Sequence, residues 1–394
     1  MMVTMKNRKK SNIGFLVLSL MLFAFSLMKV FRGANVNITV QGGIWNYISL
    51  MYYPVSFLIL CRRKFFKIGK IGLPLLGYVV VSFLSGVAFF RGYSINNIYN
   101  LLMIPYPAIV MLSFFSVKNN SKTAKVIILL AYFVCLLVNF ITILRFRFQF
   151  TARPLASDVY FSLCLFPFVL LLIKNRIIIN LSIFTEFITI FLSGKRAGLI
   201  ALAIALILYF LFRMKEKRNN KKIVFWVSAI AFLALLYYVS VQVDRSYGFG
   251  IFERLAGLSE DQGSGRASIY ATVLKAYMKS NILNQLFGHG VYASTDVIDY
   301  MAHNDFLEAL YDYGIFSAIF LMLFYFALIK RCITMKRAFS PNAPAFIVSI
   351  IIGLFLSLFS FFMTNYTYVT CMAAFWGVCL SIENDSKRAI NVQG

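Results

Sequence analysis

Long apolar runs separated by short polar connections extend along almost the whole chain. Twelve of these runs have about the length that a helix needs to cross a bilayer. They cover approximately residues 12–28, 44–60, 71–90, 101–117, 126–144, 159–173, 177–192, 198–212, 223–243, 306–328, 345–363 and 365–382. Backbone groups in lipid have to be hydrogen-bonded internally, and the runs lack the short alternation of barrel strands. The pattern therefore predicts an all-α polytopic membrane protein, with residues 1–394 forming a single integral membrane domain.

One long polar connection, residues 244–305, interrupts this pattern between the ninth and tenth spans. Within it, apolar residues recur at helical spacing between Ser264 and Ser280. The shared face consists of Tyr270, Val273, Leu274, Tyr277 and Met278. Such a helix is expected to lie along the membrane surface with its apolar stripe down. Ser294 is placed to cap a second short helix that runs toward the tenth span.

Composition and charge agree with a membrane protein and exclude two other classes. The chain is 60% hydrophobic, which is too apolar for a soluble domain. Its net charge of +25 suggests nucleic-acid binding at first. However, the basic residues cluster in alternate connections and near both termini, as the positive-inside rule requires of cytoplasmic segments. We therefore expect both termini in the cytoplasm, anionic lipid headgroups as partners and no nucleic acid. None of the six cysteines lies in the long loop, so no disulfide framework is implied.

Titratable groups gather in and just after the long loop. It contains both histidines, His289 and His303, and nine of the fourteen acidic residues lie between positions 244 and 312. On a helix, Asp299 and His303 would face the same side, where the carboxylate could orient the imidazole. Asn304, Asp305 and Glu308 follow at the start of the tenth span, a position that is costly for acids without a wet cavity or a partner. The alternative is that these residues only solvate the top of a helix.

Several arginines lie in connections on the opposite side from the basic clusters, against the positive-inside bias. They are Arg147, Arg153, Arg196, Arg245, Arg254 and Arg266. A guanidinium binds phosphate oxygens bidentately, so arginines converging on one cavity would hold a lipid pyrophosphate. Alternatively, Arg245 and Arg254 pair with the neighbouring Asp244 and Glu253. Phosphate-binding, dinucleotide, zinc and nucleophile-elbow motifs are missing from the sequence, so we expect no cofactor and no metal.

Three short motifs resemble the O-antigen polymerase and O-antigen ligase superfamily, the Wzy-type and WaaL-type membrane glycosyltransferases. Leu192-Ser193-Gly194-Lys195-Arg196-Ala197-Gly198-Leu199 is similar to a turn that opens a helix in that family. Gly263-Ser264-Gly265-Arg266, followed by a helix and Leu286-Phe287-Gly288-His289-Gly290, resembles its long-loop pattern. His303-Asn304, nine residues and then Gly314 resembles the ligase signature. Ser317 departs from that signature, which favours a polymerase.

The resemblance implies a GT-C-like fold in the bacterial inner membrane with an extracytoplasmic active site. It implies a glycan on undecaprenyl pyrophosphate as donor. A polymerase transfers this glycan to a lipid-linked repeat unit, and a ligase transfers it to lipid A–core. By position, Arg196 and Arg266 would stabilise the pyrophosphate and His303 would orient or deprotonate the acceptor. Metal-independent transfer and a chain-length regulator as partner are further expectations.

Two other classes of function remain open at this point. A transporter or flippase of lipid-linked oligosaccharide would line a path through the bundle with charge, whereas this sequence gathers charge at one face. A receptor or assembly scaffold would bind a partner through the long loop without turnover. Glu186, inside the seventh span, is either a proton or substrate group or a neutral glutamate bonded between helices.

Overall fold

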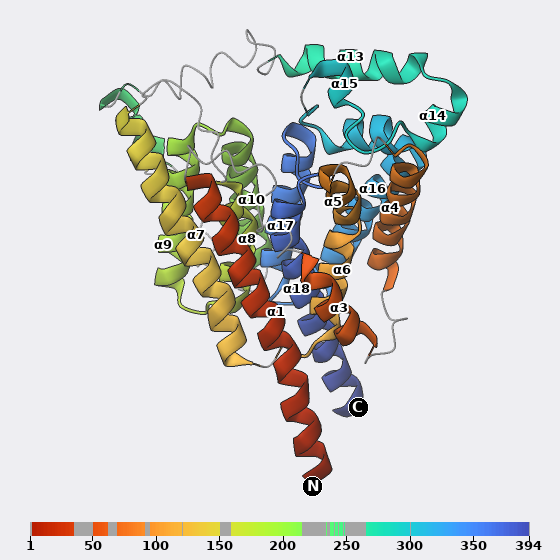
Figure 1. Cartoon of the computed structure of the whole chain (residues 1–394). Helices are drawn as coiled ribbons and strands as arrows, with labels where there is room; N and C mark the ends of the chain where they lie inside the picture. Colours follow the sequence, from red (N-terminus) through yellow and green to blue (C-terminus); the bar gives the residue numbers. More distant parts are fainter. Residues whose placement is uncertain are drawn as a thin grey trace.

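In the computed structural model, the protein is a bundle of helices whose axes are roughly aligned (Figure 1). The described residues are 2–34, 50–61, 69–90, 95–119, 121–149, 159–214, 234, 237–239, 241–242, 244–246, 248, 265–299 and 301–393. The helices are α1 (Met2–Ala34), α3 (Tyr52–Cys61), α4 (Gly69–Ala88), α5 (Ile95–Met103), α6 (Tyr106–Ser116), α7 (Lys122–Gln149), α8 (Tyr160–Leu172), α9 (Arg176–Ser193), α10 (Arg196–Met214), α13 (Arg266–Lys279), α14 (Ile282–Phe287), α15 (Thr295–Ile298), α16 (Asp305–Arg337), α17 (Ala343–Phe359) and α18 (Tyr366–Gln393).

Seven helical stretches in the described part of the chain are long and apolar enough to cross a membrane. Three shorter apolar helices, α3, α8 and α17, stand among them. Together with the lack of strands in the described ranges, this confirms the predicted all-α polytopic membrane protein. Most of the expected span 223–243 and the start of 44–60 lie outside the described residues. The count of twelve spans and the GT-C-like arrangement stay predictions.

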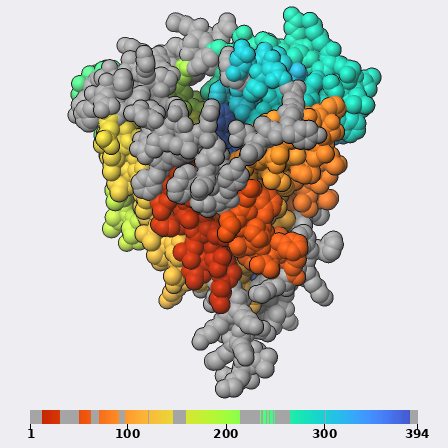
Figure 2. Space-filling model, viewed as in Figure 1, coloured from red at the N-terminus to blue at the C-terminus, as the bar shows by residue number. Residues whose placement is uncertain are grey.

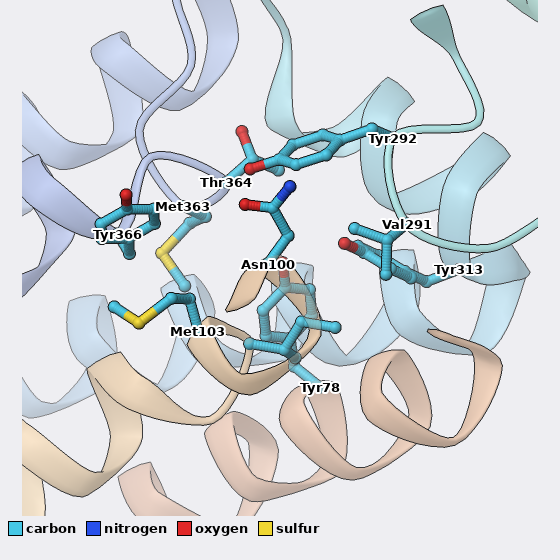
Figure 3. Close-up of a pocket in the computed structure, with 10 residues that line it drawn as sticks. Tyr78, Asn100, Met103, Val291, Tyr292, Tyr313, Met363, Thr364 and Tyr366 are labelled. Carbon is cyan, nitrogen blue, oxygen red and sulfur yellow. The ribbon is translucent and has the colours of Figure 1, made fainter. Parts of the chain in front are cut away.

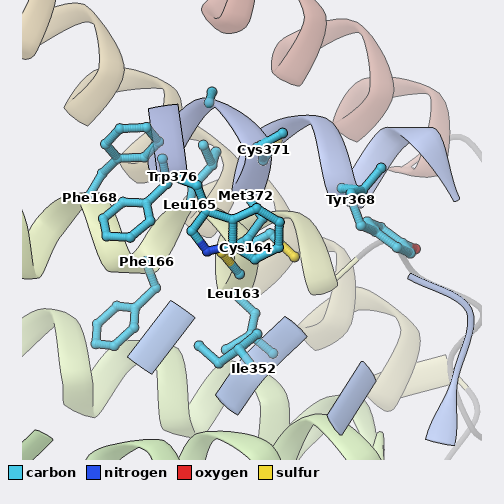
Figure 4. Close-up of a cluster of buried hydrophobic side chains, with 14 of the residues drawn as sticks. Leu163, Cys164, Leu165, Phe166, Phe168, Ile352, Tyr368, Cys371, Met372 and Trp376 are labelled. Carbon is cyan, nitrogen blue, oxygen red and sulfur yellow. The ribbon is translucent and has the colours of Figure 1, made fainter. Parts of the chain in front are cut away.

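Pairs of helices distant in sequence pack along one another and build the bundle. The most extensive pairs are α4 with α16, α6 with α18, α10 with α17 and α1 with α7. Buried aromatic rings, among them Phe166, Phe168 and Trp376, stand in the core (Figure 4). The Trp376 ring lies 5.4 Å from that of Phe324. Its indole N–H donates to the Ser349 hydroxyl at 3.0 Å, which joins α18 to α17. The indole N–H and the hydroxyl are thus paired within the protein, as a membrane interior favours.

Three short helices of the long loop cover one end of the bundle. Figure 1 shows α13 lying across this end, with α14 turning down beside α16, while the start of α1 and the end of α18 lie at the opposite end. In the space-filling view, the residues of α13 and α14 stand above those of α4 and α5 (Figure 2). The helix predicted between Ser264 and Ser280 is therefore confirmed as Arg266–Lys279.

The apolar stripe of α13 divides between two environments. Val273 is buried, together with Ile269, in a small cluster that includes Ala293, Ala302 and Tyr311. Leu274 and Met278 are exposed instead. The expected stripe is thus partly wrong, because the loop supplies a core of its own on one side of the helix. Ser294 precedes α15 as expected, but its side chain does not cap that helix.

α16 is broken at Gly314, where φ is 85° and ψ is 173°. The break lets the Gly288 turn approach closely: the amides of His289 and Gly290 donate to the Asp312 carbonyl at 3.0 and 2.8 Å. Carboxylate oxygens of Asp312 accept the Ser294 amide at 2.7 Å and its hydroxyl at 3.4 Å. The tenth span therefore begins with a separate segment, Asp305–Tyr313, that anchors the long loop.

A candidate active site at the α13 end of the bundle

A histidine and two cations from three distant parts of the chain meet at the end of the bundle covered by α13. His303 immediately precedes α16, Arg266 is the first residue of α13, and Lys195 lies in the turn between α9 and α10. Burial, together with the positive charges of Arg266 and Lys195, lowers the pKa of His303 below its usual range. The two cations therefore lie near enough to act on the imidazole, which groups the three side chains as one candidate site.

His303 has the features of a proton acceptor. Its depressed pKa leaves the imidazole neutral at pH 7. The Nδ1 atom is buried and has no hydrogen-bond partner within the described part of the chain. The ring lies 5.1 Å from the ring of Phe361, which excludes water from one side. The backbone φ of +56° is unusual for a side-chain-bearing residue and costs of order 1–2 kcal/mol. Such strain is typical of residues held in place for function.

The backbone of His303 is held by two neighbouring side chains. Its amide donates to Glu308 Oε1 at 3.2 Å, and its carbonyl accepts the Tyr270 hydroxyl at 3.3 Å. Tyr270 also donates to the Leu358 carbonyl at 3.1 Å, at the end of α17. Asn304 caps α16 by accepting the amides of the next helical turn, and its amide group donates to Leu358 at 3.2 Å. These contacts fix the imidazole relative to α13, α16 and α17.

Asp305 and Glu308 are fully buried and hold the connection between α17 and α18. The Asp305 carboxylate accepts the amides of Phe362 at 3.0 Å, Met363 at 2.6 Å and Thr364 at 3.3 Å. The Thr364 hydroxyl lies 3.0 Å from Asp305 Oδ1 and 2.8 Å from Glu308 Oε2. The backbone is therefore the partner that offsets the cost of burying these acids. Their hydrogen bonds, and those of Asn304, give no support to the predicted contact with substrate.

The turn that carries Arg196 reaches the same site. Gly194 adopts a left-handed conformation (φ 68°) that ends α9 and turns the chain into α10. The Tyr160 hydroxyl bonds the backbone of Gly198 and the side chain of Ser360, and lies within electrostatic range of Arg266. However, the charge in this turn that acts on His303 belongs to Lys195, which sequence reasoning passed over. Arg196 is half-buried, and its contact with the site stays a prediction.

The other predicted site residues are not brought to His303 by any described contact. The expected helical pairing of Asp299 with His303 is wrong, because α15 ends at Ile298 and Asp299 turns into a left-handed conformation (φ 59°). Arg245 is exposed. The remaining predicted arginines are Arg153 and Arg254, which lie outside the described residues, and Arg147, whose side chain does.

His289, the second histidine, has a structural role. Its ring stacks on Tyr311 with centroids 4.3 Å apart. Nδ1 lies 3.0 Å from the Tyr311 carbonyl and Nε2 lies 3.0 Å from the Ser280 hydroxyl, so both nitrogens are engaged. Glu186 likewise accepts the Ser162 hydroxyl at 3.0 Å, between α9 and α8, which favours the interhelically bonded alternative.

Thr364 also lines a pocket (Figure 3). It is lined by Tyr78, Asn100, Met103, Ile104, Val291, Tyr292, Tyr313, Met363, Thr364 and Tyr366. Burial and the charges of Glu308 and Asp312 raise the pKa of Tyr292 above its usual range. Two buried acids thus lie near this pocket, and none of the described residues that line it is a cation that could bind a pyrophosphate. Among the described residues, no three His, Cys, Asp or Glu side chains come together in a group suited to a metal ion.

Residues 181–322 match the family model of O-antigen ligases. The match places this part of the chain in the O-antigen ligase and polymerase superfamily. It runs from α9 into α16 and contains Lys195, Arg266 and His303. This part of the chain is thus similar to a family of membrane glycosyltransferase-like enzymes, a family that implies lipid-linked glycans as substrates. A search of curated proteins found no match.

Proposed function

We propose that this protein is a polysaccharide polymerase. It transfers a glycan from undecaprenyl pyrophosphate to the sugar of a second lipid-linked repeat unit. The observation that supports the proposal is that the charges of Arg266 and Lys195 act on the buried imidazole of His303, and that all three residues lie inside the segment that matches the O-antigen ligase family.

The two cations provide the donor side of the reaction. As the bond between the anomeric carbon and the pyrophosphate oxygen breaks, negative charge builds on the leaving group. Arg266 can grip phosphate oxygens bidentately, and Lys195 adds a second charge beside it. By the family resemblance, Arg196 contributes from the same turn. Each donor aimed at developing charge in a site that excludes water contributes about 10²–10³-fold in rate.

His303 provides the acceptor side. The acceptor hydroxyl attacks the anomeric carbon, and its proton passes to the neutral imidazole as the new bond forms. The His303 imidazole is the group we assign to this step. General-base catalysis of this kind typically contributes about 10²–10⁴-fold. The nearby cations that hold the pyrophosphate also keep the imidazole neutral, so the two roles support each other.

A ligase is the second candidate, because the matched family model is described as one. The departure at Ser317 no longer separates the two, since the Ser317 hydroxyl bonds that of Ser82 at 2.7 Å and has a packing role between α16 and α4. The products do separate them. Cells without a ligase still build long chains on the lipid carrier but fail to attach them to lipid A–core.

Glycan ladders from deletion cells complemented with variants test the proposal. Arg266→Ala and Lys195→Ala are expected to fold and to shorten or abolish the ladder, because each removes charge from the leaving-group side. Lys330→Ala, at an exposed lysine of α16, is the matched control and should restore full-length chains. Full-length ladders from both site variants, at equal protein levels, would exclude these roles.

A further inference from the structure

The hairpin formed by α13 and α14 presents an exposed apolar ridge. It consists of Leu274, Met278, Ile282, Leu283 and Phe287, whose exposed fractions lie between 42% and 76%. A contiguous set of large apolar side chains is unfavourable in water. We propose that this ridge is embedded in the phospholipid leaflet at the α13 end of the bundle. The proposal does not depend on the proposed enzymatic function.

Backbone carbonyls at the turn of the hairpin have hydrogen-bond partners within it. The side-chain amide of Gln285 lies 3.4 Å from the Tyr277 carbonyl, 3.3 Å from that of Met278 and 3.0 Å from that of Ser280. The Tyr277 hydroxyl donates back to the Gln285 carbonyl at 3.0 Å. Carbonyls at the end of a helix usually bind water. Here one glutamine replaces that water, which suits a turn placed among lipid chains.

The ridge continues into the lipid-facing side of a span. The Phe287 ring lies 5.9 Å from that of Phe316, which is in the first turn of α16 after the Gly314 break. Phe316 is exposed, as are Ile315 and Ile319 beside it. The bilayer covers the exposed apolar face of this span. Because the ridge adjoins that face, acyl chains that contact α16 would contact the ridge as well. This continuity favours lipid over a soluble protein partner.

Charge on α13 is placed to match lipid headgroups. Lys275 and Lys279 are exposed and four residues apart, on the stripe next to Leu274 and Met278. Lysines at the edge of an apolar surface extend their ammonium groups to phosphates while their stems stay in contact with acyl chains. The ridge would thereby hold α13, and with it the Arg266 guanidinium at its start, at the level of the phospholipid headgroups.

Spin labels can measure the environment of the ridge directly. Cys61 is exposed and the other five cysteines are buried, so Cys61→Ser provides a background with little labelling. Met278→Cys and Ile282→Cys place labels on the ridge, and Thr272→Cys places one on the exposed polar side of α13. The three proteins are reconstituted into vesicles of phosphatidylcholine and phosphatidylglycerol. Label accessibility to oxygen and to a water-soluble nickel complex is then compared.

The two ridge labels are expected to be accessible to oxygen and shielded from nickel, at least several-fold relative to the label at position 272. Nickel accessibility equal to that of the control would show that the ridge faces water and would overturn the proposal. Immobilised labels shielded from both reagents would show that a second copy of the chain covers the ridge, which would also overturn it. All three sites are exposed, so the substitutions leave the packing intact.

Discussion

Gly314→Ala is expected to destabilise the protein by about 2–6 kcal/mol, because two separate effects add at this position. The backbone angles, φ 85° and ψ 173°, fall in a region that essentially only glycine occupies, and a side chain there costs of order 1–3 kcal/mol. In addition, a Cβ would come well inside 3.0 Å of the Leu286 carbonyl and the Phe287 nitrogen. These are backbone atoms, which cannot rotate away, and such overpacking costs typically 1–3 kcal/mol.

Titration of the purified protein with SDS in mixed micelles measures this change in the free energy of unfolding. Gly265→Ala is the matched control, because Gly265 also has a positive φ of 75° but none of the described residues within 4 Å of an added Cβ. It should cost only the left-handed penalty of about 1–2 kcal/mol. If Gly314→Ala costs no more than Gly265→Ala, the interlocking of α14 with the break in α16 is not what holds the loop.

Two further substitutions test the electrostatics of the site. Burial and two cations lower the pKa of His303 from its usual value, and the proposed base is the neutral imidazole, so activity should fall as pH drops through that pKa. Lys195→Gln removes one cation and should move this acid limb of kcat/KM to higher pH; an unchanged limb contradicts the assignment. Asp305→Asn replaces a carboxylate acceptor by an amide that cannot accept the same amides, and should cost about 3 kcal/mol in the same SDS titration. A loss below about 1 kcal/mol would show that Asp305 does not hold the connection between α17 and α18.

The local sequence pattern was sufficient to predict the helices but not the conformation of the turns between them. Apolar runs of membrane-crossing length predict the spans, and helical spacing predicts α13 nearly to the residue. The left-handed residues Asp299 and His303 were not predictable, because neither is glycine and no local signal marks them. The conformation of His303 is held by Tyr270 of α13 and Glu308 of α16. The expected Asp299–His303 helix failed for that reason.

Site residues could be predicted from the sequence only where they lie in a short motif that resembles the superfamily. His303 and Arg266 come from motifs that resemble the superfamily, and the charge of Arg266 acts on the His303 imidazole. Lys195 lies in one of those motifs, but which of its two adjacent cations faces His303 depends on the turn at Gly194. The role of Asp305 depends on amides 57 to 59 residues away, a relation that no local pattern carries.

The most direct test is an assay of glycan transfer by the purified protein. The protein is placed in liposomes that contain a lipid-linked repeat unit. The wild-type protein should release the lipid pyrophosphate and produce a ladder of longer glycans. His303→Ala should lose at least about 10²-fold of this rate while its thermal stability shows that it is folded. Wild-type protein that forms no ladder, or a folded His303→Ala variant that polymerises at the wild-type rate, would contradict the account.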